Sequence, residues 1–254
     1  MYSHLMELAA ATKAPVVKGS YTIERNGAGT QAGKFAGMQA GTELSPAEAK
    51  DYILGALAIW SGIYRRDWLI ANGIRFSETP GASFQDLGFA IRTWVAAPCI
   101  CITPAAAYHY REDNPDSSSR KLDSGAWAAL KEFQSLADVY RALEHKEPAM
   151  RHIMVQRIFR TMQADYRLRI SYRVQEFLAA YSTLLNRHFP LETLQSSAFK
   201  KREWHDLQLI CNTPQHYPSR RRGNISCLQR IFSCRREAGH RVLRICGFTI
   251  HLPR

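Results

Sequence analysis

Residues that could do chemistry gather between positions 60 and 119. Several glycines, one aspartate and a few arginines stand there at places where an ordinary core would carry apolar side chains. A guanidinium group is a planar fork that matches phosphate oxygens, and a carboxylate can accept a proton. The pattern therefore predicts a functional site in this stretch, with Asp86 and Arg111 among its residues.

Asp86 lies at the start of a helix that we predict over residues 83–94. Ser83 stands three residues before it, which is the spacing of a capping box in which the carboxylate bonds back to a free backbone N–H. On this spacing alone, a structural role is the simpler interpretation. A role in catalysis depends on the segments that surround Asp86.

These segments resemble the second half of the catalytic domain of family 2 glycosyltransferases, in the bacterial branch that builds lipopolysaccharide and capsular polysaccharide. They occur in the family's order and at similar spacing, at residues 60–67, 74–76, 81–89 and 108–118. The resemblance implies an α/β fold. We expect an incomplete GT-A-like, Rossmann-like mixed sheet, followed by a helical appendage and a short β-hairpin tail.

The resemblance also implies roles for individual residues. Asp86 matches the general base, which takes the proton from an attacking hydroxyl while the nucleotide leaves from the opposite face, so that the anomeric carbon inverts. The residues that it places at the substrate are Tyr64, Arg65, Gly81, Arg111, Asn114, Ser117 and Ser118. For Arg65 and its neighbour Arg66, a solvated surface pair remains the alternative.

A divalent metal ion, Mg²⁺ or Mn²⁺, is implied by the resemblance because it would bridge the diphosphate and offset the charge of the leaving group. The family's Asp-x-Asp metal motif precedes the segment that residues 1–9 resemble, and this chain contains no such motif. We therefore expect a chain that lacks the nucleotide-binding half, and both an active and an inactive chain are compatible with this. His109 is a candidate late metal ligand, with a packed edge residue as the alternative.

Length and composition set wider bounds. The 254 residues are 46% hydrophobic, which is ample for one large domain or two small ones. No run of about eighteen apolar residues and no signal peptide occurs, so we expect a cytoplasmic protein. Six cysteines without a Cys-x-x-Cys pair are expected to be core residues in a reducing compartment.

The charge is concentrated near the C-terminus. From Lys200 onward there are twelve Lys and Arg against three Asp and Glu, which supplies nine of the twelve net positive charges. Such a tail predicts contact with an anionic surface, namely the inner face of the plasma membrane, with a solvated tail as the alternative. Nucleic acid is a weaker partner, because no zinc spacing or helix-turn-helix signal accompanies the charge.

Periodicity predicts the elements that position the site. A helix over residues 2–12 and a strand over 16–23 form the first unit, and residues 26–41 are expected to be a surface loop. Ser45-Pro46-Ala47-Glu48 has the signature of a helix start, and that helix is predicted to run toward Ile59. Short strands are predicted at residues 99–103 and 107–111.

The second half is predicted to be mainly helical, with apolar stripes over residues 127–140, 153–162 and 174–188. A linker with little fixed structure is expected between Lys200 and Arg222, and a β-hairpin over residues 231–252. The predicted domains are residues 1–122, the C-terminal half of a GT-A domain; 123–195, the helical appendage; and 196–254, the basic linker and tail.

Two functions are compatible with these features. The first is an inverting glycosyltransferase, or part of one, that moves a sugar from a nucleotide-sugar donor to a lipopolysaccharide, capsular or lipid-linked acceptor. The second is a catalytically inactive protein that keeps the acceptor half of the fold and docks on a membrane or on a partner enzyme.

Overall fold

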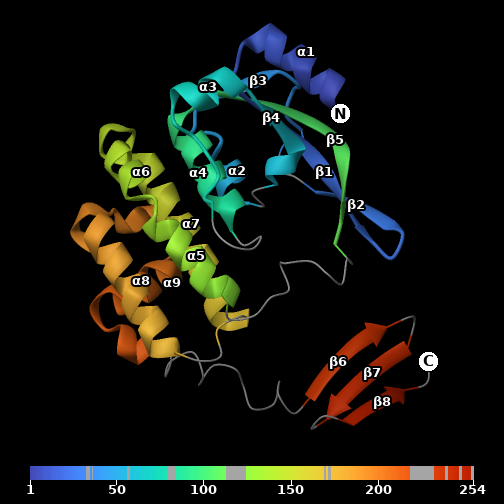
Figure 1. Ribbon diagram of the computed structural model, residues 1–254. Coiled ribbons are helices and arrows are strands. Elements are labelled where there is room, and N and C mark those ends of the chain that lie inside the picture. Colours follow the sequence, from blue (N-terminus) through green and yellow to red (C-terminus); the bar gives the residue numbers. More distant parts are fainter. Residues whose placement is uncertain are drawn as a thin grey trace.

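A computed structural model describes most of the chain (Figure 1). The described residues are 1–32, 35, 37–55, 58–78, 84–112, 124–168, 170, 173–217, 232–237, 240–245 and 248–252. A mixed sheet occupies the first half, and a group of helices packs beside it. The predicted α/β class, a Rossmann-like sheet followed by helices, is confirmed.

Strand β1 (Val16–Arg25) is the centre of the sheet. It pairs in parallel with β5 (Ile100–Arg111) and antiparallel with β2 (Ala28–Ala32) and β4 (Gly62–Tyr64), while β3 (Thr42–Leu44) pairs with β5. The first six residues of β1 are buried. Strands β1 and β5, the two longest, therefore lie side by side in parallel, and their C-terminal ends reach the same edge of the sheet.

Strand β5 corrects one prediction, because the two short strands expected on either side of residue 104 are one continuous strand. Pro104 has no N–H to donate to a ladder. The register with β1 shifts next to it, where Gly19 pairs with Thr103, Ser20 with Ala106 and Tyr21 with Tyr108. This register shift accommodates the missing N–H of Pro104 without ending the ladder, so the strand continues to Arg111.

The predicted surface loop over residues 26–41 is wrong in its first part, which forms the β1–β2 hairpin. Asn26 and Gly27 occupy its turn with φ angles of 49° and 77°. Positive φ at both central positions is the geometry of a type I′ turn, for which Asn-Gly is the preferred pair. This pair was the sequence signal for the hairpin.

Helix α1 (Tyr2–Thr12) forms as predicted, and helix α3 (Arg66–Ala71) follows strand β4. The predicted helix from Ser45 to Ile59 is wrong in its extent, because α2 covers only Lys50–Leu54 and a 3₁₀ turn follows at Ile59–Ser61. The capping box itself exists: the Ser45 N–H donates to Glu48 at 2.8 Å. It caps a turn, and the helix ends where Gly55 adopts an extended backbone.

The second half is helical, with one further correction. Its helices are α5 (Ser124–Gln134), α6 (Ala137–Ala142), α7 (Pro148–Leu168), α8 (Val174–His188) and α9 (Lys201–Asn212). Short 3₁₀ turns lie at Leu143–His145, Leu191–Thr193, Ser196–Ala198 and Pro214–His216. The linker expected from Lys200 is wrong in its first part, because α9 buries Leu207 and Ile210.

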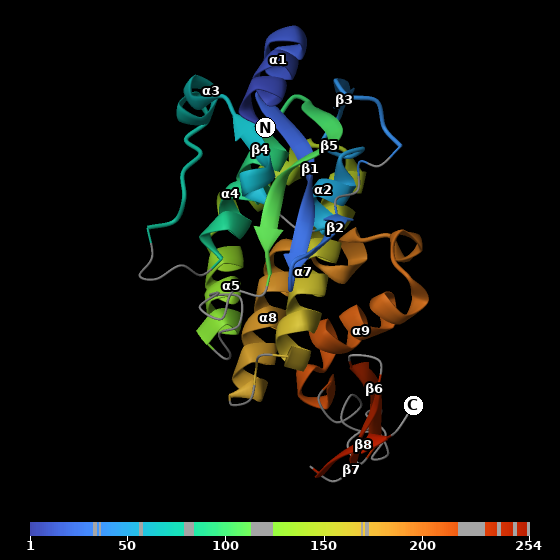
Figure 2. The same ribbon diagram turned by 90° about the vertical axis from the view of Figure 1, so that its right-hand side faces the viewer.

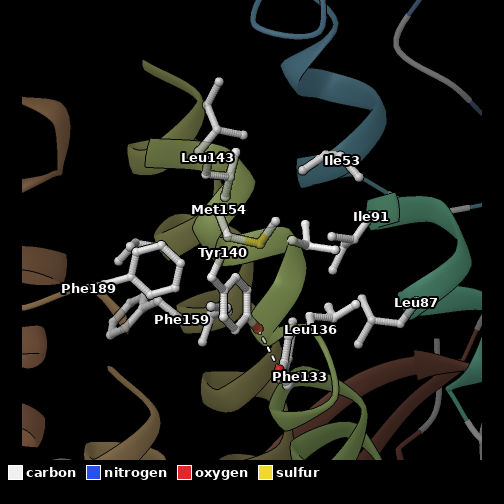
Figure 3. Packing of buried hydrophobic residues seen from close by; sticks show 14 of the residues in the cluster. Ile53, Leu87, Ile91, Phe133, Leu136, Tyr140, Leu143, Met154, Phe159 and Phe189 are labelled. Atoms are coloured by element: carbon white, nitrogen blue, oxygen red, sulfur yellow. Dashed lines mark hydrogen bonds between the residues drawn. The ribbon is translucent and has the colours of Figure 1, made fainter. Parts of the chain in front are cut away.

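One hydrophobic core joins the sheet to the helices, from Val16 to Tyr217. Figure 3 shows its centre, where Tyr140 lies among side chains from several helices and donates its hydroxyl proton to the carbonyl of Phe133 at 2.7 Å. Leu87 and Ile91 bring helix α4 (Gln85–Ala96) into the same cluster. Helix α4 is therefore held rigidly from one side.

The predicted C-terminal hairpin is a three-stranded antiparallel sheet of β6 (Phe232–Glu237), β7 (His240–Ile245) and β8 (Phe248–Leu252). Figure 2 shows the same arrangement of elements from the side. Across the part of the chain that the structure describes, no helix combines the length and the apolar character needed to cross a bilayer.

Candidate functional site

Asp86 lies in the first turn of α4 and is exposed to solvent. Its Oδ1 accepts a hydrogen bond from the N–H of Leu87 at 2.9 Å. Ser83, the residue of the predicted capping box, lies outside the described residues. Because Leu87 and Ile91 anchor the helix in the core, the exposed carboxylate is carried on a fixed helix.

Helix α4 begins and strand β5 ends toward the same end of the sheet, as both views show (Figures 1 and 2). Arg111 is the last residue of β5 and is exposed. Within the described part of the chain, no ion pair or hydrogen bond joins Arg111 to Asp86. The structure thus brings the two to one end of the fold without a direct contact. Gly81, Asn114, Ser117 and Ser118 lie outside the described residues.

Tyr64 and Arg65 occupy different surroundings. The Tyr64 hydroxyl donates to the carbonyl of Ile59 at 3.2 Å, and burial raises its pKa well above the ordinary value. Its ring packs edge-on against Phe89 of α4, with 5.0 Å between centroids. Arg65 is exposed, with its guanidinium 3.6 Å from the carboxylate of Asp67. Tyr64 therefore joins the sheet to α4, while Arg65 is open to solvent.

Lys18 is a buried cation that the sequence analysis missed. It is only 2% exposed, and its Nζ donates to the carbonyl of Ala58 at 2.6 Å. The ring of Tyr52 lies 4.9 Å from the same nitrogen. Burial lowers the pKa of Lys18 to about 7, because a charged amine is poorly solvated there.

Gly62 leaves the space that Lys18 fills. A Cβ at position 62 would lie 2.7 Å from Cδ of Lys18 and 2.6 Å from the carbonyl oxygen of Val17. In the sequence, Lys18 appears only as a lysine within the strand predicted over residues 16–23, and its position opposite Gly62 follows from the pairing of β1 with β4.

An aromatic group lies over the second half of the two long strands. The ring of Trp60 stacks on Tyr108 and Tyr110, with centroid distances of 4.2 and 5.0 Å, and meets Tyr21 edge-on at 4.8 Å. Tyr108 and Tyr110 alternate with His109 and Arg111 along β5. Since neighbouring residues of a strand point to opposite faces, this end of the sheet has an aromatic face and a charged face.

His109, the candidate metal ligand, is on the charged face. Its Nδ1 lies 2.7 Å from a carboxylate oxygen of Glu24, and both side chains are largely exposed. Among the described residues, no cluster of three or more His, Cys, Asp or Glu that could hold a metal occurs. The described side chains therefore do not fit a complete divalent metal centre.

Two further charged residues lie close enough to Asp86 to interact with it electrostatically. Burial raises the pKa of Glu132, and the negative charge of Asp86 adds to the effect, while Ser77 and Arg92 oppose it. Burial lowers the pKa of Arg157 to about 10, and Asp86 is one of the carboxylates that oppose this shift. Asp86 thus has one anion and one cation among its electrostatic neighbours.

Arg157 also holds the end of helix α2. Its guanidinium donates to the carbonyl oxygens of Ile53 and Gly55, at 3.4 and 3.1 Å. Neither Arg157 nor Glu132 stood out in the sequence, because both lie within helical stretches where charged residues usually face water.

No model of a protein family and no curated protein matches this sequence. Solved structures do match it. S. aureus TarS 1–349 in complex with UDP-GlcNAc superimposes with a TM-score of 0.67 at 15% identity, over 100% of this chain and 71% of that chain. The same TarS fragment in complex with UDP gives 0.62 at 14% identity, over 98% and 69%. A longer TarS chain gives 0.52 at 14% identity, over 98% and 42%.

This likeness confirms the fold predicted from the resemblance. The chain has the mixed α/β, Rossmann-like sheet and following helices of the GT-A glycosyltransferase fold of TarS, and the match extends over nearly the whole chain.

Proposed function

We propose that this protein takes part in sugar transfer from a nucleotide-sugar donor to a glycan hydroxyl, with inversion at the anomeric carbon. The observation that carries the proposal is the position of Asp86: an exposed carboxylate on a helix anchored in the core, at the sheet end where β5 finishes. The fold that it shares with TarS, one of whose structures contains UDP-GlcNAc, supports a UDP-linked sugar as the donor.

In the proposed reaction, Asp86 accepts the proton of the acceptor hydroxyl as its oxygen attacks the anomeric carbon. The bond from that carbon to the diphosphate breaks on the opposite side, and the nucleotide leaves with the bonding electrons. Asp86 lies in the first turn of α4, where the positive end of the helix dipole favours a negative charge.

The diphosphate is proposed to contact Arg111 and Arg65, whose guanidinium groups are exposed and match phosphate oxygens. Asn114, Ser117 and Ser118 belong to the same proposal as short donors beside Arg111. The divalent ion that GT-A folds often use is not assigned to residues here, since His109 and Glu24 supply only two ligands in the described chain.

The acceptor is proposed to be a lipopolysaccharide, capsular or lipid-linked glycan. The basic segment from Lys200 supports docking at the anionic inner face of the membrane, where each basic residue contributes about 1 kcal/mol. Sedimentation with phosphatidylserine vesicles, with duplex DNA as competitor, tests this part. If duplex DNA displaced the protein from the vesicles, nucleic acid would be the preferred partner and this part of the proposal would be contradicted.

A non-catalytic docking protein is the second candidate, favoured by the lack of an Asp-x-Asp motif in this sequence. Transfer from UDP-GlcNAc to a glycan acceptor, followed by proton NMR of the new anomeric centre, separates the two. The first proposal predicts a product of inverted configuration. Binding of UDP-GlcNAc without turnover favours the second candidate, and retained configuration overturns the inverting mechanism.

A further inference from the structure

Glu132 is a buried carboxylate to which the proposed reaction gives no role. It belongs to helix α5 and is 6% exposed. Its Oε1 accepts a hydrogen bond from the Ser77 hydroxyl at 2.8 Å. Within the described part of the chain, no lysine or arginine lies within ion-pair distance of it. Since burying an unpaired charge is costly, stability alone does not explain a glutamate here.

The same oxygen lies against Gly88 of helix α4. A Cβ built on Gly88 would lie 1.8 Å from Oε1 of Glu132 and 2.8 Å from its carboxyl carbon. No side chain fits at position 88 while the carboxylate keeps its place. The absence of a side chain at Gly88, two residues beyond Asp86, therefore lets the carboxylate of Glu132 lie against the backbone of α4.

Ser77 and Gly88 stand on the two sides of Asp86 in the chain. Glu132 thus contacts both Ser77 and helix α4, whose first turn carries Asp86. A second contact joins the same two regions, because the ring of Phe76 stacks on Phe89 with 4.2 Å between centroids and 6° between planes. Residues 76 and 77 are therefore fastened to helix α4, which carries Asp86 in its first turn, by one polar and one aromatic contact.

We propose that Glu132 is a positioning residue that fixes Asp86 by binding Ser77 and seating against Gly88. This inference rests on the proposed function of Asp86. A fixed start of α4 holds the general base at the distance and angle that proton transfer requires, and small displacements of such groups are costly to the rate.

Three charged or titratable groups interact electrostatically with Glu132 among the described residues: Asp86 and Arg92 of α4 and Tyr140 of α6. Arg92 also donates to Asp138 of α6 at 2.5 Å. Burial and the charge of Asp86 raise the pKa of Glu132, while Ser77 and Arg92 oppose this shift. Protonation of Glu132 weakens its bond to the Ser77 hydroxyl. Transfer should then fall on the acid side as Glu132 takes up its proton.

Four variants test the inference: Glu132→Ala, Glu132→Gln, Gly88→Ala and the double variant of Glu132→Ala with Gly88→Ala. Glu176→Gln is the control, because Glu176 is an exposed glutamate of α8 that pairs with Arg173. The readouts are kcat and donor KM for sugar transfer across pH, and hydrogen exchange of the amides of residues 84–89 without substrate.

We expect Glu132→Ala to lower kcat by about 10- to 100-fold while KM changes by less than about twofold. Glu132→Gln keeps an acceptor for Ser77, so its kcat at neutral pH should stay close to that of the unmodified protein. Because Gln does not titrate, the fall of kcat on the acid side should become less steep by one proton. Gly88→Ala should lower kcat alone but add nothing in the double variant, because the methyl group then fills the vacated space. Amide exchange at residues 84–89 should accelerate in Glu132→Ala.

Unchanged exchange in Glu132→Ala, additive effects in the double variant, or an acid limb that Glu132→Gln leaves unaltered would overturn the inference. These results differ from a failure of the proposed function, in which the unmodified protein transfers no sugar. In that case the hydrogen-exchange data alone decide whether Glu132 holds the start of helix α4 in place.

Discussion

The side-chain nitrogen of Lys18 lies 2.6 Å from the carbonyl oxygen of Ala58. That carbonyl also accepts hydrogen bonds from the N–H and the hydroxyl of Ser61, each at 2.9 Å. Ala58 itself has a φ of 27°, which is rare for a residue other than glycine. Hydrogen bonds from Lys18 and Ser61 therefore stabilise this strained residue. It lies two positions before Trp60, whose ring contacts Tyr21, Tyr108 and Tyr110.

Replacing Lys18 with Met should remove a pH dependence of stability. The folded pKa of about 7 lies below the 10.5 of a free lysine, so between these values the unfolded chain binds more protons. The free energy of unfolding therefore rises with pH in this window, by up to about 1.4 kcal/mol per pH unit. In Lys18→Met this contribution is absent, and the Ser61 donors still satisfy the Ala58 carbonyl.

Urea unfolding of both proteins between about pH 7 and 10.5 measures this difference. Lys131→Met is the control, since Lys131 is an exposed lysine of α5. A difference between Lys18→Met and the unmodified protein that stays constant over the window would show that Lys18 is not buried as described.

Arg157→Met should destabilise the protein by about 1–3 kcal/mol, because the carbonyl oxygens of Ile53 and Gly55 lose their donor. Arg160→Met is the matched control from the next turn of α7, where an exposed arginine donates to Leu54 at 3.3 Å. A surface change of that kind should alter stability by less than about 0.5 kcal/mol. If thermal unfolding showed the same loss of stability in Arg157→Met and Arg160→Met, the hydrogen bonds of Arg157 to Ile53 and Gly55 would not explain the effect.

Gly27→Ala should cost about 1–2 kcal/mol, because Gly27 has a φ of 77° at the tip of the β1–β2 hairpin. No atom lies within 4 Å of a Cβ added there, so the cost is conformational and not steric. Gly27→Asn should recover much of the loss, since Asn tolerates this conformation. If both variants lost the same stability by calorimetry, the turn assignment would be wrong.

The sequence allowed the start of α4 to be placed, because Asp86 precedes a run of apolar residues at helical spacing that ends in the core. Lys18 could not be identified in the same way. Its burial depends on Tyr52, Ala58 and Gly62, which reach it only when β4 folds back on β1. The contact is a property of strand pairing, which a single sequence does not show.

Glu132 was missed for a related reason. It adjoins the predicted apolar stripe that contains Leu130 and Phe133, where a glutamate normally faces water. Only the packing of α4 against α5 brings Gly88 to it. By contrast, the Asn26-Gly27 hairpin and helix α9 had local signals, an Asn-Gly pair and a capping Glu203, that were available in the sequence.

The most direct test of the general-base assignment is sugar transfer by Asp86→Asn beside Glu176→Gln. Glu176 is the control: it is an exposed carboxylate in the first turn of α8, as Asp86 is in the first turn of α4, and it pairs with Arg173. We expect Asp86→Asn to lower turnover by about 100-fold or more with donor binding unchanged, and Glu176→Gln to keep it. Turnover by Asp86→Asn equal to that of Glu176→Gln would contradict the assignment of Asp86 as the general base.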